Sequence, residues 1–106
     1  MIFHTYIIDL DGTLCITDEG KLGPLYEEAK PIPERIIRVN ELYEQGHTII
    51  IDSARGNKSG KNWYYFTLDQ LKSWGLKFHT LRTGDKLTGD FYIDDRGINS
   101  NDFFGK

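Results

Sequence analysis

The feature that most constrains the fold is an apolar run over residues 6–14, YIIDLDGTL, which stops abruptly at two aspartates. Asp is depleted in strands and Gly interrupts them, so this run predicts a buried strand that ends where the aspartates begin. Two carboxylates at one strand end can hold a hard cation, and one can act as nucleophile while the other moves protons. Asp9 and Asp11, followed by Gly12 and Thr13, therefore form the first candidate site; the alternative is a charged turn after an edge strand.

Strand-like and helix-like patterns alternate along the rest of the chain. Such alternation predicts an α/β fold, with a parallel sheet covered by helices. Ligands of open parallel sheets bind outside the carboxyl ends of the strands. The expected strands cover residues 3–8, 47–52, 76–81 and 91–93, and the expected helices run from Pro33 to Gly46 and from Tyr64 to Gly75.

Polar clusters follow two of the other expected strands. Ser53 and Arg55 come after an apolar run, where the hydroxyl can bond a phosphoryl oxygen and the guanidinium can take phosphate or carboxylate bidentately. The alternatives are a turn cap for Ser53 and a solvated charge for Arg55. Asp94 and Asp95 end the last apolar triplet, and adjacent carboxylates repel unless a cation or donors compensate. Alternation indicates that one of the pair binds a cation directly, and Asp95 is the preferred one.

Composition limits the classes of protein that remain. At 106 residues the chain predicts a single domain, 1–106, and its formal charge of −3 argues against binding nucleic acid through overall charge. One cysteine excludes a disulfide framework and fits a reducing compartment. No apolar run is long enough for a membrane span and no signal-peptide pattern is present, so the cytoplasm is the expected location.

The remaining reactive side chains carry weaker signals. The three histidines have no spacing typical of metal ligands, and Cys15 has no His partner in the sequence pattern, so packing roles are expected. Residues 55–65 hold three basic residues followed by three aromatic ones, which fits either a nucleotide or sugar-phosphate contact or a solvated loop before a core-facing helix. Residues 15–31 are rich in Gly and Pro and predict a loop with a small hairpin. Phe103 and Phe104 are expected to cover a sheet edge or a neighbouring molecule.

Taken together, these motifs resemble the haloacid dehalogenase superfamily of phosphatases across residues 3–95. The run DLDGTL matches the family's first motif, Ser53 its second, and the aspartate pair its fourth. Lys86 best fits the third motif, with Arg82 as competitor. Gly89 and Asp90 also fit a looser form of the fourth motif, but they precede a strand instead of following one. The resemblance implies a three-layer, Rossmann-like parallel sheet without a cap domain, most similar to small capsule-biosynthesis phosphatases.

The resemblance also implies an activity. The chain is expected to be an Mg²⁺-dependent phosphomonoesterase acting on a small phosphorylated metabolite such as a sugar phosphate. Asp9 would be the nucleophile and Asp11 the acid and base. Mg²⁺ would lie between Asp9, Asp11, Asp95 and the nearby Asp94, while Ser53, Arg55, Lys86, Gly12 and Thr13 would contact the phosphoryl group. The alternatives are a 5′-nucleotidase or polynucleotide 3′-phosphatase, for which a nucleic-acid partner is not favoured, and a non-catalytic binding protein. So small a core is compatible with a homodimer.

Overall fold

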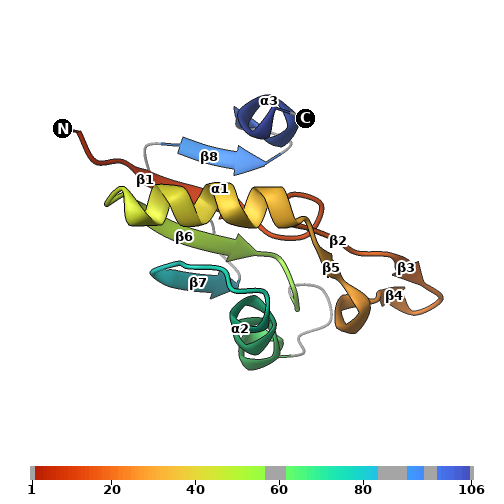
Figure 1. The fold of residues 1–106 in the computed structure, drawn as a ribbon. Helices are drawn as coiled ribbons and strands as arrows, with labels where there is room; N and C mark the ends of the chain where they lie inside the picture. Colours follow the sequence, from red (N-terminus) through yellow and green to blue (C-terminus); the bar gives the residue numbers. More distant parts are fainter. Residues whose placement is uncertain (1, 57–61, 84–90, 95–97, 106) are drawn as a thin grey trace.

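The computed structural model describes residues 2–56, 62–83, 91–94 and 98–105. These residues form an α/β fold around one parallel sheet of five strands, in the order β7-β6-β1-β8-β9 (Figure 1). The strands of this sheet are β1 (Thr5–Asp9), β6 (Thr48–Ser53), β7 (Thr80–Thr83), β8 (Phe91–Asp94) and β9 (Ile98–Asn99), and the helices are α1 (Pro33–Glu44), α2 (Tyr64–Ser73) and α3 (Ser100–Phe104).

The order of the strands creates a switch point beside β1. From β1 the chain builds outward through β6 to β7, and it then returns to the other side of β1 with β8 and β9. Ile8 of β1 pairs with Ile51 of β6 and with Ile93 of β8, so β1 is the central strand of the sheet. In open parallel sheets, the carboxyl ends of strands beside such a reversal form a crevice that binds ligands. Asp9, the last residue of β1, and Asp11 just after it lie at this place.

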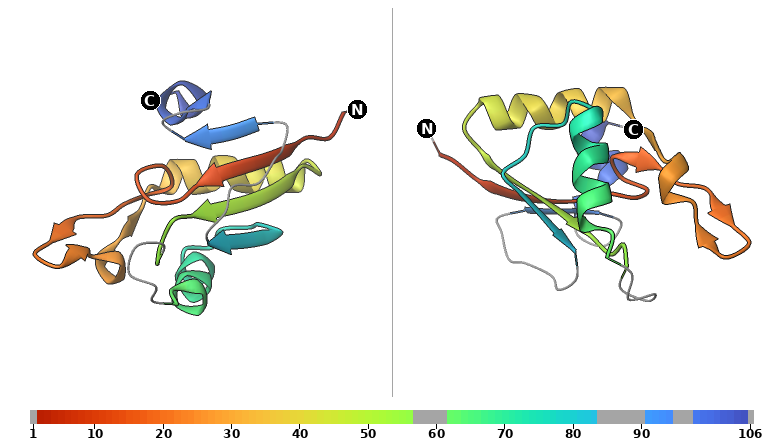
Figure 2. Two further views of the ribbon diagram at one scale, coloured as in Figure 1. Left: turned by 180° about the vertical axis from the view of Figure 1, so that it is seen from behind. Right: turned by 90° about the horizontal axis from the view of Figure 1, so that it is seen from below.

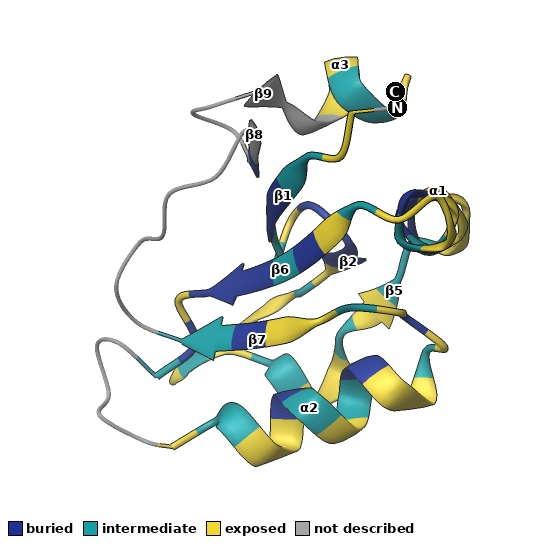
Figure 3. Ribbon diagram, turned by 90° about the vertical axis from the view of Figure 1, so that its left-hand side faces the viewer, coloured by how far each residue is buried: buried dark blue, intermediate teal, exposed yellow. Residues whose placement is uncertain are grey.

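All three described helices cover the same face of the sheet, as the view from below shows (Figure 2). The crossovers β1–α1–β6 and β6–α2–β7 run in the same direction, and their right-handedness places both helices on one face. The two described layers are therefore the sheet and this helix layer, whereas three layers were expected. The core between them contains Ile8, Ile51, Val39 of α1 and Leu71 of α2, all without exposed surface. Buried residues dominate β6 where it faces this core (Figure 3).

The ends of α1 and α2 confirm the predicted start and stop signals. Pro33 occupies the first turn of α1, where its missing N–H costs nothing. Gly46 and Gly75 follow the two helices with φ of +97° and +73°, a conformation that side chains rarely adopt. A Cβ on Gly46 would also lie 2.6 Å from the ring of Phe3. No helix in the described ranges combines the length and the apolar character needed to cross a membrane.

Two regions differ from the expected pattern. The third strand, expected at 76–81, covers Thr80–Thr83, because Leu76 serves as a buried contact after α2 before the chain enters the sheet. No sequence pattern predicted β9 or α3. Phe103 does cover the sheet, as one of the alternatives expected for it, by packing against Tyr6 at 5.9 Å between ring centroids.

Residues 15–31 form a flap that extends beyond the sheet (Figure 1). The expected hairpin is present in the form of two small antiparallel pairs, which join β2 (Cys15–Ile16) to β5 (Lys30–Pro31) and β3 (Glu19–Gly20) to β4 (Gly23–Pro24). The 3₁₀ helix η1 (Tyr26–Glu28) completes this flap.

Two histidines accept backbone hydrogen bonds at the amino-terminal edge of the sheet, in line with the expected packing roles. His47 Nδ1 accepts the N–H of His4 at 3.1 Å, and His79 Nδ1 accepts the N–H of Ile49 at 3.0 Å. Both imidazoles therefore carry their proton on Nε2 when neutral. Each of these side chains thus satisfies one backbone N–H group near the start of a strand.

We expect His79→Ala to lower the free energy of unfolding by about 1–2 kcal/mol, because the buried N–H of Ile49 loses its acceptor. His79→Asn places an amide oxygen near the position of Nδ1 and should restore much of that loss. Urea unfolding of the three proteins measures the effect. Equal stability of the Ala and Asn variants would show that the hydrogen bond is not the source of the loss.

Candidate functional site

Asp9 and the tight turn after it form the centre of the site. The N–H groups of Thr13 and Leu14 both bond to the carbonyl of Leu10, at 3.1 and 2.8 Å, which folds the chain back directly after β1. Gly12 has a φ of +81° in this turn, so only its conformation, and no close neighbour, disfavours a side chain. Thr13 Oγ1 donates to Asp9 Oδ2 at 3.4 Å. Asp9 therefore lies at the carboxyl end of β1, and the Thr13 hydroxyl orients one of its carboxylate oxygens.

Asp11 is held by a guanidinium and a hydroxyl. Arg55 Nε donates to Asp11 Oδ2 at 2.9 Å, and Arg55 Nη2 donates to Oδ1 at 2.8 Å. Thr17 Oγ1 of the flap donates to Oδ1 at 2.6 Å. Burial raises the pKa of Asp11, but the hydrogen bonds from Arg55 and Thr17 and the charge of Arg55 outweigh it, so the pKa lies below its ordinary value. Asp11 is an ionised carboxylate in this arrangement.

The guanidinium of Arg55 lies against a carboxylate, one of the two kinds of partner predicted for it. Its side chain has no exposed surface, and Nη1 donates to Thr67 Oγ1 at 3.2 Å and to Gln70 Oε1 at 2.7 Å. All three guanidinium nitrogens therefore contact protein groups. The solvated alternative for Arg55 is wrong, and the bidentate contact in the structure is with the Asp11 carboxylate, while a phosphoryl contact stays a prediction.

Ser53 makes the contact expected of a turn cap. It is buried at the end of β6, and its Oγ accepts the N–H of Arg55 at 3.1 Å. The hydroxyl keeps its own proton for a second partner. Asp52, and not Ser53, is the register partner of Asp9.

Three charged residues form a row across neighbouring strands at the carboxyl end of the sheet. Asp9 pairs in register with Asp52 of β6, which pairs with Arg82 of β7. Register partners share a face, so the three lie on the face opposite the helix layer. Asp52, whose role the sequence left open, is buried. Arg82 thus lies two strands from Asp9 in the same row.

The last motif is described only in part. Asp94 ends β8 directly after Ile93, the register partner of Ile8, so its backbone lies at the strand end next to Asp9. Asp95, Lys86, Gly89 and Asp90 lie outside the described residues, as do Lys58 and Lys61 of the basic loop. Within the described part of the chain, no three His, Cys, Asp or Glu side chains gather as a metal site.

Four contacts of the site were missed at the sequence level. Thr17 and Tyr26 belong to the flap, and Thr67 and Gln70 lie on α2 beside its apolar stripe. Two polar residues spaced three apart on the edge of an apolar helix face are a usable signal for such a contact. The flap residues carried no comparable pattern.

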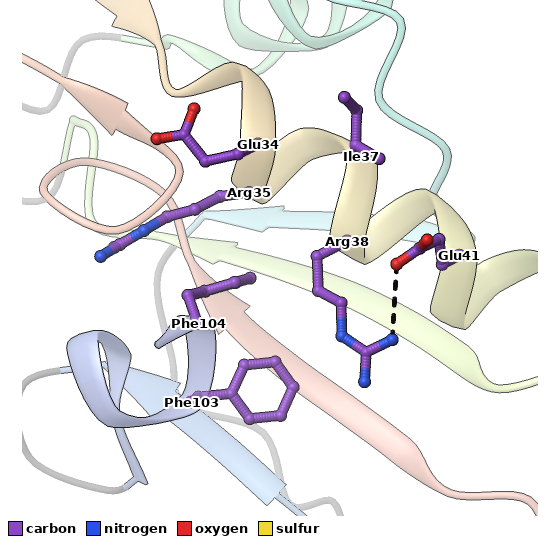
Figure 4. A pocket seen from close by; sticks show the side chains of 7 residues that line it. All are labelled: Glu34, Arg35, Ile37, Arg38, Glu41, Phe103 and Phe104. Atoms are coloured by element: carbon purple, nitrogen blue, oxygen red, sulfur yellow. Dashed lines mark hydrogen bonds and ion pairs between the residues drawn. The ribbon is translucent and has the colours of Figure 1, made fainter. Parts of the chain in front are cut away.

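Arg35 of α1 was missed as well. It is buried, and its Nη1 donates to the carbonyl of Thr13 at 2.9 Å while Nη2 donates to Asn101 Oδ1 of α3 at 2.8 Å. Arg35 also lines a cavity of about 290 Å³ between α1 and α3, with Phe103 and Phe104 on the other wall (Figure 4). None of the predicted site residues lines this cavity. Through its hydrogen bond to the Thr13 carbonyl, Arg35 connects α1 to the turn after Asp9.

Cys15 has the properties of a buried structural thiol. Burial and the nearby charge of Asp11 raise its pKa to about 12, so the thiol stays protonated at neutral pH. Its Sγ lies 3.4 Å from Asp11 Oδ1 and donates there. This agrees with the expectation that Cys15 is not a catalytic nucleophile.

Comparison with known proteins supports the fold. No protein-family model matches the chain, and no curated protein matches it. A crystal structure of an MCSG target from Vibrio cholerae is similar, with a TM-score of 0.71 and 24% sequence identity over 96% of this chain and 88% of that one. At this identity the similarity shows a shared α/β fold and carries no activity across.

Proposed function

We propose that this protein is an Mg²⁺-dependent phosphomonoesterase of the haloacid dehalogenase type, acting on a small phosphorylated metabolite such as a sugar phosphate. One observation carries the proposal: Asp9 ends the central strand β1 and Asp11 follows it at the switch point of the sheet, where Asp94 ends the neighbouring strand. Phosphoryl transfer at such a crevice needs a nucleophile, a proton carrier and positive charge. The first two are side chains of the same turn.

The two aspartates have different roles in the proposed reaction. The Asp9 carboxylate attacks phosphorus, a bond forms between its oxygen and phosphorus, and the bond from phosphorus to the leaving oxygen breaks. Asp11 gives a proton to that leaving oxygen and then takes one from the water that attacks the aspartyl-phosphate. This releases inorganic phosphate and regenerates Asp9. Ser53 and Lys86 would bind the phosphoryl oxygens, as the family resemblance implies.

The donor set at this edge fits Mg²⁺. The carboxylates of Asp9 and of Asp94 or Asp95, together with the backbone carbonyl of Asp11, are hard oxygen donors of the kind Mg²⁺ prefers. Both oxygens of the Asp11 side chain accept from Arg55, so the proposal assigns the backbone carbonyl of Asp11 to the ion and leaves the side chain to proton transfer. When bound, the ion would supply positive charge to the phosphoryl oxygens.

A second function, a 5′-nucleotidase or polynucleotide 3′-phosphatase, has an observation in its favour. The ring of Trp63 meets Tyr26 of the flap at 4.9 Å and Phe66 at 5.3 Å, and Tyr65 is exposed nearby on α2. Aromatic side chains beside a phosphate site can stack on bases. The formal charge of −3 weighs against a long nucleic-acid partner.

A third function, non-catalytic binding, is favoured by the pair of Arg55 and Asp11. An ionised Asp11 suits the proton-accepting half of the reaction, whereas the first half needs its protonated form. A protein that only binds phosphorylated ligands has no such requirement. Turnover therefore separates this function from the first two.

We expect phosphate release to require Mg²⁺. The test measures release from sugar phosphates, nucleotides and 3′-phosphorylated oligonucleotides, with Mg²⁺, with EDTA, and with Mg²⁺ restored in excess. Loss of release in EDTA and its full return with Mg²⁺ support the phosphomonoesterase, and the preferred substrate separates it from a nucleotidase. Folded protein that releases no phosphate from any of these, but still binds a phosphorylated ligand, would contradict the catalytic proposal.

A further inference from the structure

Arg55 is a buried arginine whose three guanidinium nitrogens all donate hydrogen bonds to protein groups. It follows β6 but reaches Asp11 after β1 and both Thr67 and Gln70 on α2. Its guanidinium also lies 4.6 Å from the ring centroid of Tyr26 in the flap. One buried group thus contacts the turn after the central strand, a helix and the flap.

The geometry of the pair with Asp11 fixes the carboxylate. Two parallel N–H donors, at 2.9 and 2.8 Å, define the plane of the carboxylate as well as its distance. A single ammonium would restrain the distance alone. Because Nη1 is bound by α2, the guanidinium itself is held at a second point. The orientation of Asp11 is therefore set by α2 through Arg55.

Three contacts attach the flap to Arg55 or to one of its hydrogen-bond partners. Gln70 accepts from Arg55 with Oε1 and donates with Nε2 to the carbonyl of Tyr26 at 2.9 Å. The ring of Tyr26 packs against the guanidinium, and Thr17 donates to the carboxylate that Arg55 holds. Both limbs of the flap, near β2 and at η1, therefore meet at the ion pair.

We propose that Arg55 is the positioning residue of this site, which orients the Asp11 carboxylate and fastens the flap of residues 15–31 to α2 through Tyr26 and Gln70. The catalytic part rests on the proposed phosphomonoesterase activity. The attachment of the flap does not, since it follows from contacts that exist without substrate.

Steady-state kinetics test the catalytic part with Arg55→Lys and Arg55→Ala. Every guanidinium nitrogen of Arg55 is bound to a protein group, so kcat should fall by about 100-fold, the lower range for a misplaced acid–base group, with KM nearly unchanged. Added guanidinium ion should restore part of kcat in Arg55→Ala and none in Arg38→Ala, a matched change at an exposed arginine of α1. A raised KM with unchanged kcat would overturn the proposal, because it would identify Arg55 as a substrate-binding group.

Limited trypsin digestion tests the flap without any need for activity. Lys21 is exposed in the flap, next to the exposed Leu22. Cleavage after Lys21 should be faster in Arg55→Ala, and also in Tyr26→Leu, which leaves the ion pair in place. It should be unchanged in Tyr26→Phe and Arg38→Ala.

The kinetic and the digestion experiments distinguish failure of the proposed function from failure of the flap attachment. If the wild-type protein releases no phosphate, the proposed function fails, while faster cleavage in Tyr26→Leu than in Tyr26→Phe still supports the attachment of the flap. If the wild type is active but both flap variants are cleaved at its rate, the attachment is refuted. Circular dichroism shows whether each variant is folded. If Arg55→Ala does not fold, the digestion of Tyr26→Leu still tests the attachment of the flap.

Discussion

Asp9→Asn is expected to abolish phosphate release, with a fall in kcat of at least about 1,000-fold, the scale seen when a covalent nucleophile is removed. The amide is nearly the same size as the carboxylate and can still accept from Thr13 Oγ1, so the turn after β1 should keep its shape. It lacks the charge and the nucleophilic oxygen. The loss should therefore appear in turnover and not in folding.

The design of this experiment depends on its controls. Asp18→Asn makes the same chemical change at an exposed position of the flap and should leave release unchanged. Mass spectrometry of the variant excludes deamidation back to aspartate. Substantial release by a pure Asp9→Asn protein would refute the aspartyl-phosphate mechanism, and Asp52, its buried neighbour in register, would become the next residue to test.

Removal of the Asp11 side chain should have the largest effect on stability. The side chain of its partner Arg55 has no exposed surface, and the side chain of Asp11 is 26% exposed. Asp11→Ala therefore leaves a buried charge without its counter-ion. We expect a loss of about 3 kcal/mol, the lower end for breaking a buried pair. Glu41→Ala breaks the exposed pair with Arg38, and there we expect no more than about 0.5 kcal/mol. Urea unfolding measures both.

A double variant isolates the pair itself. Arg55→Met in the Asp11→Ala background removes the buried charge, so the double variant should be more stable than Asp11→Ala alone. If the two losses simply add, the residues do not interact, and the ion pair is not what stabilises this end of the sheet.

The pH dependence of that loss has a defined sign. The pKa of Asp11 is lowered on folding, because Arg55 and Thr17 outweigh the effect of burial. Its contribution is therefore complete above the unfolded pKa of about 4 and is lost as the pH falls through the folded value. The difference between wild type and Asp11→Ala should be largest near about pH 7 and shrink toward about pH 2. A difference that is constant with pH would mean that the loss is not electrostatic.

Several features of the fold could be predicted from local chemistry. Pro33, Gly46 and Gly75 fixed the ends of α1 and α2 because each has a backbone property that few other residues share. The apolar runs before Asp9 and Asp94 identified β1 and β8 because a buried strand is short and apolar. The third strand was misplaced because 76–81 holds more apolar residues than 80–83, and only pairing with Ile50 and Ile51 of β6 selects the second segment.

The site was predictable to the level of its aspartates and no further. Asp9 and Asp11 are two residues apart in the chain, so a local pattern was enough to find them. Arg55 was found, and a carboxylate was one of its predicted partners, but Asp11 could not be identified as that carboxylate because it lies 44 residues away; the partners on α2 lie 12 and 15 residues away. No local pattern reports a contact between such distant segments.

The sequence by itself determined an α/β chain whose central strand ends in two carboxylates, because strand period, helix stops and the depletion of Asp in strands act over a few residues. The tertiary structure alone decided that Arg55 faces Asp11 instead of solvent, that Asp52 and Arg82 continue the row from Asp9, and that the flap reaches the ion pair. These depend on strand order and register, which follow from how the whole core packs.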